Sequence, residues 1–278
     1  MSTTEFTSLD ASFRGSRGFF SDIDRDLLSG IRAWRLWTML GWNDIRQRYR
    51  RSVLGPFWIT ISMAVFISLL SVIYSHIFKI ELKNYMPFLA LGYIIWGFIS
   101  QTTGESFISF QESERIIRQI RLPYSIYVFR VVWRNFIVFL HTIVIFIPVA
   151  IFFDVRPGFT GLLALPGLAL VYINQAWLTL SLAIICTRYR DVQQIVGTGI
   201  QIMLFATPIM WPVSALGSAI IIAHVNPLYH MIELVRAPML GNIPSMLSWL
   251  VVIACAIVGW TAAMLLLRRA SRRLVFWL

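Results

Sequence analysis

The chain has 278 residues, of which 58% are hydrophobic and only 13% are charged, and it carries a net charge of +11. About a quarter of the residues of an average soluble domain are charged, because its surface faces water. This composition excludes an ordinary soluble protein and indicates an integral membrane protein.

The first fifty residues are polar and mixed in charge. They lack a short apolar core followed by small residues, so we expect no cleavable signal peptide. We interpret residues 1–30 as a cytoplasmic tail and residues 31–53 as an amphipathic helix at the membrane interface.

The segment 31–53 combines aromatic and basic side chains at helical spacing. A helix would place on one face Ile31, Trp34, Trp42, Ile45 and Tyr49, and on the neighbouring face Arg32, Arg35, Asn43, Arg46 and Arg50. Aromatic rings beside Arg are typical of a helix that lies among lipid headgroups. We interpret this segment as a docking surface for a cytoplasmic partner. The alternative is that its arginines only set the topology of the first span. The cations of that surface would be Arg46, Arg48, Arg50 and Arg51.

Six long stretches of the chain contain no Asp, Glu, Lys or Arg, and each is long enough to cross a membrane, which takes roughly 20 apolar residues. They run over 52–78, 84–104, 135–153, 157–187, 192–232 and 237–267. We place the six-span region at 54–267. We therefore predict an all-α membrane protein with six transmembrane helices and a short tail at 268–278.

Glu105 lies in a polar run near the end of the second predicted span. A carboxylate at that depth is costly and usually faces protein or water. We consider three roles: contact with the cytoplasmic Arg cluster, contact with the sugar-phosphate head of a lipid-linked substrate, or simple exposure to water at the interface.

The basic residues are distributed very unevenly between the two sides of these spans. With six spans, twenty of the 24 Lys and Arg residues fall on the side of both termini. Since cytoplasmic segments carry the excess of Lys and Arg, we expect both termini to be cytoplasmic. Two complete crossings within 192–232 would put the C-terminus outside, so that stretch should cross only once.

The region 213–240 is too broken for an ordinary span, because it contains Gly217, Pro227 and several polar residues. Broken helices are tolerated at membrane depth where protein or water receives their free backbone groups. We predict one or two short re-entrant helices on the outer side, with an ordinary apolar outer loop as the alternative.

Five motifs occur in order along the chain and resemble one transporter family. They are RYRRSVLGPFW (48–58), ERIIRQIRLP (114–123), RYRD (188–191), TPIMWP (207–212) and NPLYHMIELVRAPMLG (226–241). Together they resemble permease subunits of ABC-2 type polysaccharide exporters, which handle O-antigen, capsule or teichoic acid, over roughly residues 30–268. The resemblance implies a single transmembrane domain and, on overall similarity, favours O-antigen.

The resemblance also implies partners. Such permeases act as homodimers with two copies of a separate nucleotide-binding subunit, which binds ATP and Mg. The chain agrees, since it contains no GxxxxGK[ST] phosphate loop. By resemblance, the segment from Glu114 to Pro123 is the coupling helix. Its isoleucines would enter a cleft of the ATPase and its arginines would meet acidic residues around that cleft; the residues are Glu114, Arg115, Ile116, Ile117, Arg118, Ile120 and Arg121.

The family's substrate suggests roles for three further groups. A sliding polysaccharide needs many similar weak sites, and aromatic faces can stack on sugar rings. The channel candidates are Phe66, Tyr74, Tyr93, Trp96, Phe205 and Trp211. Arg forks suit a polyprenyl pyrophosphate, which gives Arg48, Arg50 or Arg51 a second role at the cytoplasmic entrance. The outer-gate candidates are Asn226, Pro227, Glu233 and Arg236.

Other functions are disfavoured by what the sequence lacks. An enzyme would need clustered acids, metal ligands or a nucleophile with its base, and the four histidines show no metal spacing. Cys186 and Cys255 lie in apolar runs and are interpreted as buried hydrophobes. We therefore expect no catalytic, metal or nucleic-acid site. A secondary transporter would need more embedded ionisable residues than Glu105. An ABC-2 exporter of a drug or lipid remains the alternative.

Overall fold

The computed structural model describes residues 21–50, 55, 57–120, 122–213 and 221–278, and in these ranges the chain forms helices and connecting segments with no strand. The helices before the centre of the chain are α2 (Ser21–Arg32), α3 (Trp34–Tyr49), α4 (Phe57–Phe78), α5 (Leu82–Ser106), α6 (Ser109–Glu112), α7 (Glu114–Gln119) and α8 (Tyr124–Thr142). Those that follow are η1 (Ile143–Ile145), α9 (Phe146–Phe152), η2 (Gly158–Leu163), α10 (Ala164–Arg188), α11 (Asp191–Ala206), α12 (Ile221–Val225), α13 (Pro227–Met239), α14 (Met246–Ala270) and α15 (Leu274–Trp277).

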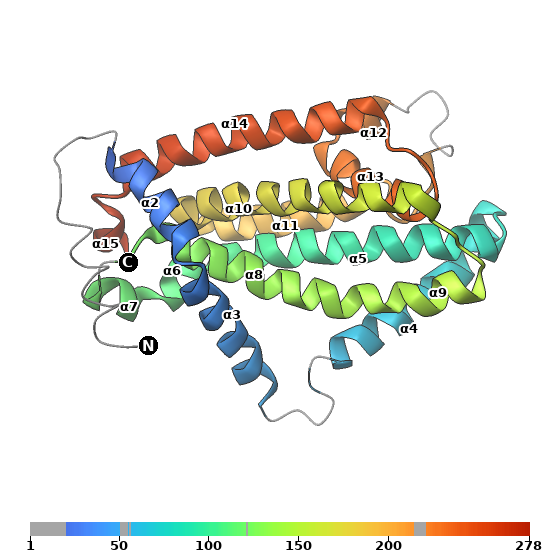
Figure 1. The fold of residues 1–278 in the computed structure, drawn as a ribbon, viewed down its shortest axis with the longest axis horizontal. Coiled ribbons are helices and arrows are strands. Elements are labelled where there is room, and N and C mark those ends of the chain that lie inside the picture. The colour runs from blue at the N-terminus through green and yellow to red at the C-terminus, as the bar shows by residue number, and fades with distance from the viewer. Residues whose placement is uncertain (1–20, 51–54, 56, 121, 214–220) are drawn as a thin grey trace.

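Long helices lie side by side along the longest axis of the molecule. Figure 1 shows α5, α8, α10, α11 and α14 in this arrangement. Four helical segments are long and apolar enough to cross a membrane, namely Phe57–Phe78, Tyr124–Phe152, Gly158–Arg188 and Met246–Ala270. The prediction of a helical membrane protein is therefore confirmed, and four of the six predicted spans have a matching helix.

The other two predicted spans also coincide with helices, α5 and α11, but these two are not among the helices that are long and apolar enough to cross a membrane. α5 has 25 residues and ends in the polar run that contains Glu105. α11 has 16 residues, which at 1.5 Å per residue give about 24 Å against roughly 30 Å of hydrocarbon. The total of six spans stays a prediction.

The third span begins earlier than its charge-free stretch suggested. The stretch started at residue 135, whereas α8 begins at Tyr124 and contains Arg130 and Arg134. These two arginines are therefore helical residues rather than loop residues, because carboxylates from neighbouring helices neutralise them.

The predicted interface helix is divided in two. α2 ends at Arg32, Ala33 has φ −79° and ψ 30°, and α3 ends at Tyr49 rather than reaching residue 53. Trp34 and Trp42 are half exposed, whereas Ile45 is buried against the chain. Part of the predicted apolar face thus packs inward. Arg51 and the tail before residue 21 lie outside the described residues.

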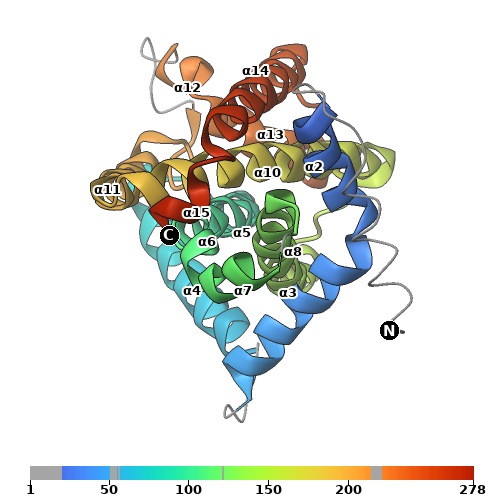
Figure 2. The same ribbon diagram turned by 90° about the vertical axis from the view of Figure 1, so that its left-hand side faces the viewer.

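The two ends of the molecule differ in the elements they gather. α2, α6, α7 and α15 lie at one end, which we call the basic end, and both ribbon views agree on this (Figures 1 and 2). α12 and α13 lie at the opposite end (Figure 1). Segments that are far apart in sequence, such as α2 and α15, are thereby brought to one end.

α5 forms the centre of the hydrophobic core. Its buried residues form the core with side chains of α8, α10 and α13, and α4 packs on its outside. The hydroxyl of Tyr85 donates to the carbonyl of Met210, which ties the outer half of α5 to the segment 207–213. The core thus links the long helices to the segment that precedes α12.

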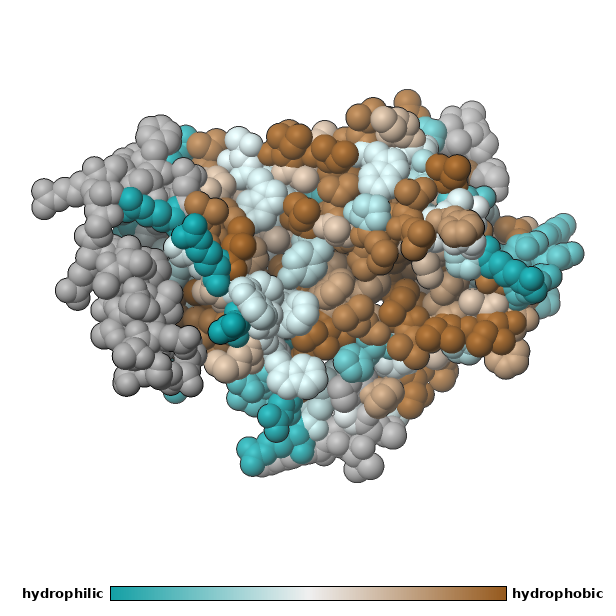
Figure 3. Space-filling model, in the orientation of Figure 1, coloured by the Kyte–Doolittle hydropathy of each residue, from teal (hydrophilic) through white to brown (hydrophobic). Residues whose placement is uncertain are grey.

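The surface carries a broad apolar band. Figure 3 shows this band between ends where hydrophilic side chains gather. Two helices are also largely uncovered by the rest of the chain: only 11% of the apolar window of α4 is buried, and α11 has no buried residue. Large side chains such as Val65 and Phe205 are therefore more than 60% exposed, which indicates that lipid or another chain covers these helices.

Candidate functional site

A buried ion-pair cluster lies where α3 meets α5 and α8. Arg130 and Arg134 are four residues apart on α8, so they share one face of that helix. Arg130 binds Asp44 of α3 through two hydrogen bonds, with Nε–Oδ2 of 2.7 Å and Nη2–Oδ1 of 2.6 Å. Arg134 adds a third bond to the same carboxylate, with Nη1–Oδ2 of 3.0 Å.

Glu105 of α5 completes this cluster. Arg134 donates to its Oε2 from Nη2 at 2.7 Å and from Nε at 3.0 Å. Asn135 donates to the same oxygen at 2.7 Å, and Arg48 donates to Oε1 at 2.8 Å. Of the roles considered for Glu105, contact with the cytoplasmic Arg cluster is the one that the structure shows.

The cluster joins α3, α5 and α8 through charged side chains, three of which are largely buried. The side chain of Arg134 is 6% exposed, and those of Asp44 and Glu105 are 13% and 17% exposed. Buried charges are stable only when paired and hydrogen-bonded. Each carboxylate here has two Arg partners, so the cluster fixes the position of α3 against the membrane helices.

A second polar contact fixes α2 at the start of α8. Asp26 accepts hydrogen bonds from the backbone N–H groups of Tyr124 at 2.8 Å and Ser125 at 3.1 Å, which are the first free donors of α8. The hydroxyl of Ser125 donates back to the Asp26 carbonyl at 2.8 Å. Burial raises the pKa of Asp26 above its usual value of 3.8, against the lowering effect of these hydrogen bonds.

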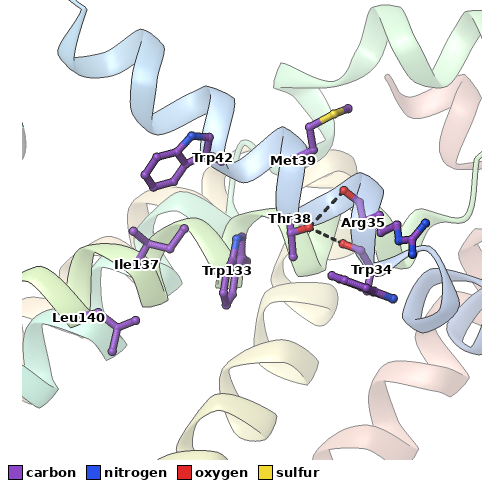
Figure 4. A pocket seen from close by; sticks show the side chains of 8 residues that line it. All are labelled: Trp34, Arg35, Thr38, Met39, Trp42, Trp133, Ile137 and Leu140. Carbon is purple, nitrogen blue, oxygen red and sulfur yellow. Dashed lines mark hydrogen bonds between the residues drawn. The ribbon is translucent and has the colours of Figure 1, made fainter. Parts of the chain in front are cut away.

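An apolar groove of about 510 Å³ lies between α3 and α8 (Figure 4). Its lining residues are Trp34, Arg35, Thr38, Met39, Trp42, Trp133, Ile137 and Leu140. The only hydroxyl among them, that of Thr38, donates to the carbonyls of Trp34 and Arg35 at 2.7 and 3.1 Å. Arg35 is the charged lining residue, and its guanidinium carbon lies 5.6 Å from the ring centre of Trp34. The other lining side chains are mainly apolar or aromatic, so most of the groove offers a surface suited to hydrocarbon.

The expected coupling segment forms α7 at the basic end, but its side chains differ in exposure. Ile117 is buried and belongs to a core cluster with Phe110, and Ile116 packs partly against that cluster. Ile120 is 40% exposed, so of the three isoleucines it is the one available to a partner.

The charged residues of the coupling segment lie mainly on its outside. Arg115 is exposed, and Arg118 pairs with Glu114 at 2.8 Å across one helical turn. Arg121 lies outside the described residues. The exposed residues of α7 are therefore Arg115, Arg118 and Gln119, beside the exposed part of Ile120.

The arginines expected at the pyrophosphate entrance differ in whether an acidic residue already binds them. Arg46 and Arg50 are exposed near the end of α3. Arg48 is engaged by Glu105, and Arg51 lies outside the described residues. Sequence spacing could not reveal this difference, because Glu105 is 57 residues away along the chain.

The six candidate channel aromatics fall into three groups by exposure, with Tyr93 among the partly buried ones. Phe66 and Phe205 are exposed, and the ring of Phe66 lies 5.0 Å from that of Tyr93. Tyr74 and Trp211 are partly buried, and Trp211 donates to the Phe205 carbonyl at 2.9 Å. Trp96 is 5% exposed and packs in the core of the single chain.

The outer-gate candidates lie together at the opposite end. Asn226 caps α13 by accepting from Leu228 N–H at 3.0 Å, and its amide donates to Thr207 at 2.8 Å. Pro227 is the first residue of α13, a position at which proline fits well. In the described part of the region predicted to be broken, residues 213 and 221–240, the chain forms the short helices α12 and α13.

The predicted pair of Glu233 and Arg236 is present. Arg236 is 1% exposed and donates to Glu233 from Nε at 2.9 Å. It also donates to the Pro208 carbonyl at 2.9 Å and lies 4.0 Å from the ring centre of Phe88. This Arg therefore holds α13 to α5 and to the segment after α11.

Sequence reasoning missed two groups of residues. Asp44, Arg130 and Arg134 were not predicted as a cluster. The four-residue spacing of Arg130 and Arg134 places them on one helical face, but their acidic partners come from other helices. His230 is fully buried, and its ring nitrogens contact Ser248 Oγ at 2.9 Å and the His224 carbonyl at 2.8 Å. No spacing rule would have paired residues of α13 and α14.

No metal-binding arrangement is found in the part of the chain that the structure describes, where no three His, Cys, Asp or Glu residues gather. The described site is therefore made of ion pairs, aromatic rings and apolar surfaces.

Comparison with known proteins gives one family and several relatives. Residues 35–240 match the sequence model of a family described as ABC-2 type transporter. Two Klebsiella pneumoniae proteins named O-antigen export system permease protein RfbA are 27% and 26% identical over 172 residues, or 60% of this chain and 65% of each relative. A Myxococcus xanthus protein of the same name is 22% identical over 174 residues, or 62% of this chain and 66% of the relative. The matches span slightly less than two thirds of these relatives.

Proposed function

Because this chain belongs to the ABC-2 type transporter family, we propose that it is the permease subunit of an ATP-driven exporter. Its cargo would be a polysaccharide of the O-antigen type, linked to polyprenyl pyrophosphate, that crosses the bacterial cytoplasmic membrane. The observation that carries this proposal is that the relatives named O-antigen export permeases align with 60% or more of the chain. Export of a drug or lipid through the same fold is the alternative.

The proposed topology has six spans with both termini in the cytoplasm. Four helices are long and apolar enough to cross, and α5 and α11 would be the remaining two. α7 carries two arginines, and five more line the pocket where α10 and α14 end beside α15. Their gathering at the end where α7 and α15 lie (Figure 2) supports this orientation, because cytoplasmic segments carry most Lys and Arg.

A homodimer would explain the exposure of α4 and α11. Both helices contact α5, and together they present large apolar side chains to the outside of the single chain. A second copy on this face would enclose a conduit lined by Phe66, Tyr93 and Phe205. Aromatic rings there would offer a sliding glycan several similar stacking sites.

A separate nucleotide-binding subunit would dock at the basic end and bind ATP and Mg. α7 supports this assignment through the exposed Ile120 beside Arg115 and Arg118. The ion-pair cluster would then transmit movement, since it joins α3 rigidly to α5 and α8.

The pyrophosphate would be met by the exposed arginines Arg46 and Arg50, because Glu105 already engages Arg48. Guanidinium groups bind phosphate oxygens in pairs, which lysine does not reproduce. Export with Arg46→Lys and Arg50→Lys together should fall, whereas full export would show that the fork geometry is unnecessary.

At the outer side, α12 and α13 would form a gate over the conduit. The buried Arg236 supports a closed resting position, because it binds both Glu233 and the Pro208 carbonyl. Glu233 lies on α13 itself, so opening would break the contacts of Arg236 with the Pro208 carbonyl and the Phe88 ring. Loss of the contacts of a buried charge is costly, so the gate would open only with cargo or with ATP hydrolysis.

Deletion of the gene in its host tests the proposal. We expect surface polysaccharide to disappear and its lipid-linked form to accumulate inside the cell, with recovery when the wild-type gene is restored. Unchanged amounts of both, in a strain without a second exporter, would contradict glycan export. Drug sensitivity or altered membrane lipids in that strain would favour the alternative.

A further inference from the structure

A second pocket, separate from the ion-pair cluster and the groove, lies at the basic end between α10, α14 and α15. Its volume is about 760 Å³. The lining residues are Ile184, Ile185, Arg188, Tyr189, Leu265, Leu266, Arg268, Arg269, Ala270, Arg272, Arg273 and Trp277. Nothing in the proposed export function assigns a role to this pocket.

The pocket is strongly cationic on one side. Five of its lining residues are arginines, and among the described residues that line it there is no Asp or Glu. Arg188 is held in place by aromatic rings, since its guanidinium carbon lies 4.9 Å from the ring centre of Trp277 and 5.1 Å from that of Tyr189. Cation–π contacts of this kind position the guanidinium group and leave its N–H donors available to an anion.

The other side of the pocket is apolar. Ile184 and Ile185 of α10 and Leu265 and Leu266 of α14 supply this apolar lining. The cationic and apolar parts follow one another along the two helices, because the arginines occupy the last turn of each helix and the segment after it. A ligand that fits both parts must itself have an anionic head and a hydrocarbon tail.

The position of the pocket further restricts the class of ligand that could bind there. It lies at the ends of two segments that are long and apolar enough to span a membrane, Gly158–Arg188 and Met246–Ala270. The apolar part is thus at the depth of acyl chains and the arginines are at the depth of headgroups. Basic pockets between membrane helices are known binding places for anionic lipid headgroups.

We propose that this pocket binds one anionic phospholipid of the surrounding membrane. Its phosphate accepts hydrogen bonds from Arg188, Arg269 and Arg273, and an acyl chain lies along the isoleucines and leucines of α10 and α14. An acidic protein surface is a poorer occupant, because it would leave the apolar half of the pocket without a partner. The bound lipid would connect the C-terminal segment to α10.

Native mass spectrometry of the full-length purified chain, with phosphatidylglycerol or phosphatidylcholine added in equal amounts, tests this assignment. We expect clear preference for phosphatidylglycerol in the wild type. Replacing Arg188 and Arg273 by Gln should weaken that binding about 25- to 30-fold, since each Arg near a membrane surface contributes roughly fivefold. The matched control, Arg115→Gln with Arg118→Gln, removes the same charge from α7 at the same end and should change binding less than about twofold.

Three results would overturn the proposal: no preference between the two lipids, an equal loss in the control, or retained binding in the pocket variant. Unchanged lipid binding together with loss of ATPase-subunit assembly would instead assign the pocket to a protein partner. A photoactivatable phosphatidylglycerol gives a test that needs only the wild-type chain. Labelling should fall on residues 184–189 and 265–277, and labelling confined to other segments would refute the site whether or not the variants fold.

Discussion

Replacing Arg134 by Met removes the cation at the centre of the ion-pair cluster while keeping a side chain of similar length. The side chain is 6% exposed, and it donates two hydrogen bonds to Glu105 and one to Asp44. Removing one partner of a buried ion pair costs about 3–5 kcal/mol. Asp44 keeps both bonds from Arg130, and Glu105 keeps Arg48. We therefore expect the lower end of that range, about 3 kcal/mol.

The assay is thermal unfolding of the detergent-solubilised protein, followed by its tryptophan fluorescence. A loss of this size should lower the midpoint by roughly 6–10 °C for a chain of this length. Arg156→Met is the matched control: Arg156 also pairs with an acid at 2.8 Å, but its side chain is 84% exposed. The control should stay within about 0.5 kcal/mol of the wild type.

A double-mutant cycle separates the ion pair from general packing. Glu105→Gln should be less destabilising in the Arg134→Met background than in the wild type, with a coupling of about 1–2 kcal/mol. If Arg134→Met unfolds at the wild-type temperature, or if the two effects simply add, then Arg134 does not hold α3 to the membrane helices and the reasoning fails.

Three further predictions concern other parts of the chain. Ile120→Asp should abolish stimulation of the ATPase by cargo while leaving the unfolding temperature unchanged, because this side chain is 40% exposed; normal coupling in a transport assay would contradict docking at α7. Gly167→Ala should destabilise the fold by about 1–3 kcal/mol, since its new Cβ would meet the carbonyl oxygen of Leu234. The control Gly104→Ala places its Cβ where no neighbouring atom lies within 4 Å, so it should be neutral in the same unfolding assay. Asp26 has a raised pKa, so the folded state holds its proton more tightly than the unfolded state does, and stability should fall as the pH rises from 3.8 through the raised pKa. Asp26→Asn should remove this pH dependence from unfolding curves. An unchanged pH dependence would exclude Asp26 as its source.

Much of the fold was readable from hydropathy. α4 and α14 are long runs without charge in their apolar parts, and such runs have few alternatives to crossing a membrane. The start of α8 was not readable in this way, because Arg130 and Arg134 interrupt the apolar run. Only the approach of Asp44 and Glu105 from other helices makes these charges compatible with a membrane helix, and that approach is tertiary information.

The candidate site was predictable where its contacts are local. Glu233 and Arg236 are one turn apart, and their pairing follows from helical geometry. The surroundings of Arg236 were not predictable, since Phe88 and Pro208 come from distant parts of the chain. The same limit applies to Ile117: its sequence neighbours suggest a surface helix, whereas packing against Phe110 buries it.

The contacts around Arg236 make one structural unit of two segments that are far apart in sequence. Arg236 reaches Pro208 and Phe88, a Cβ at Gly92 would lie 3.1 Å from its guanidinium group, and Tyr85 binds the carbonyl of Met210. Chimeras that exchange only residues 207–240 between related exporters would place a foreign surface against an unchanged α5. Residues 85–92 must therefore be transplanted with residues 207–240 when cargo range is engineered by exchanging outer segments.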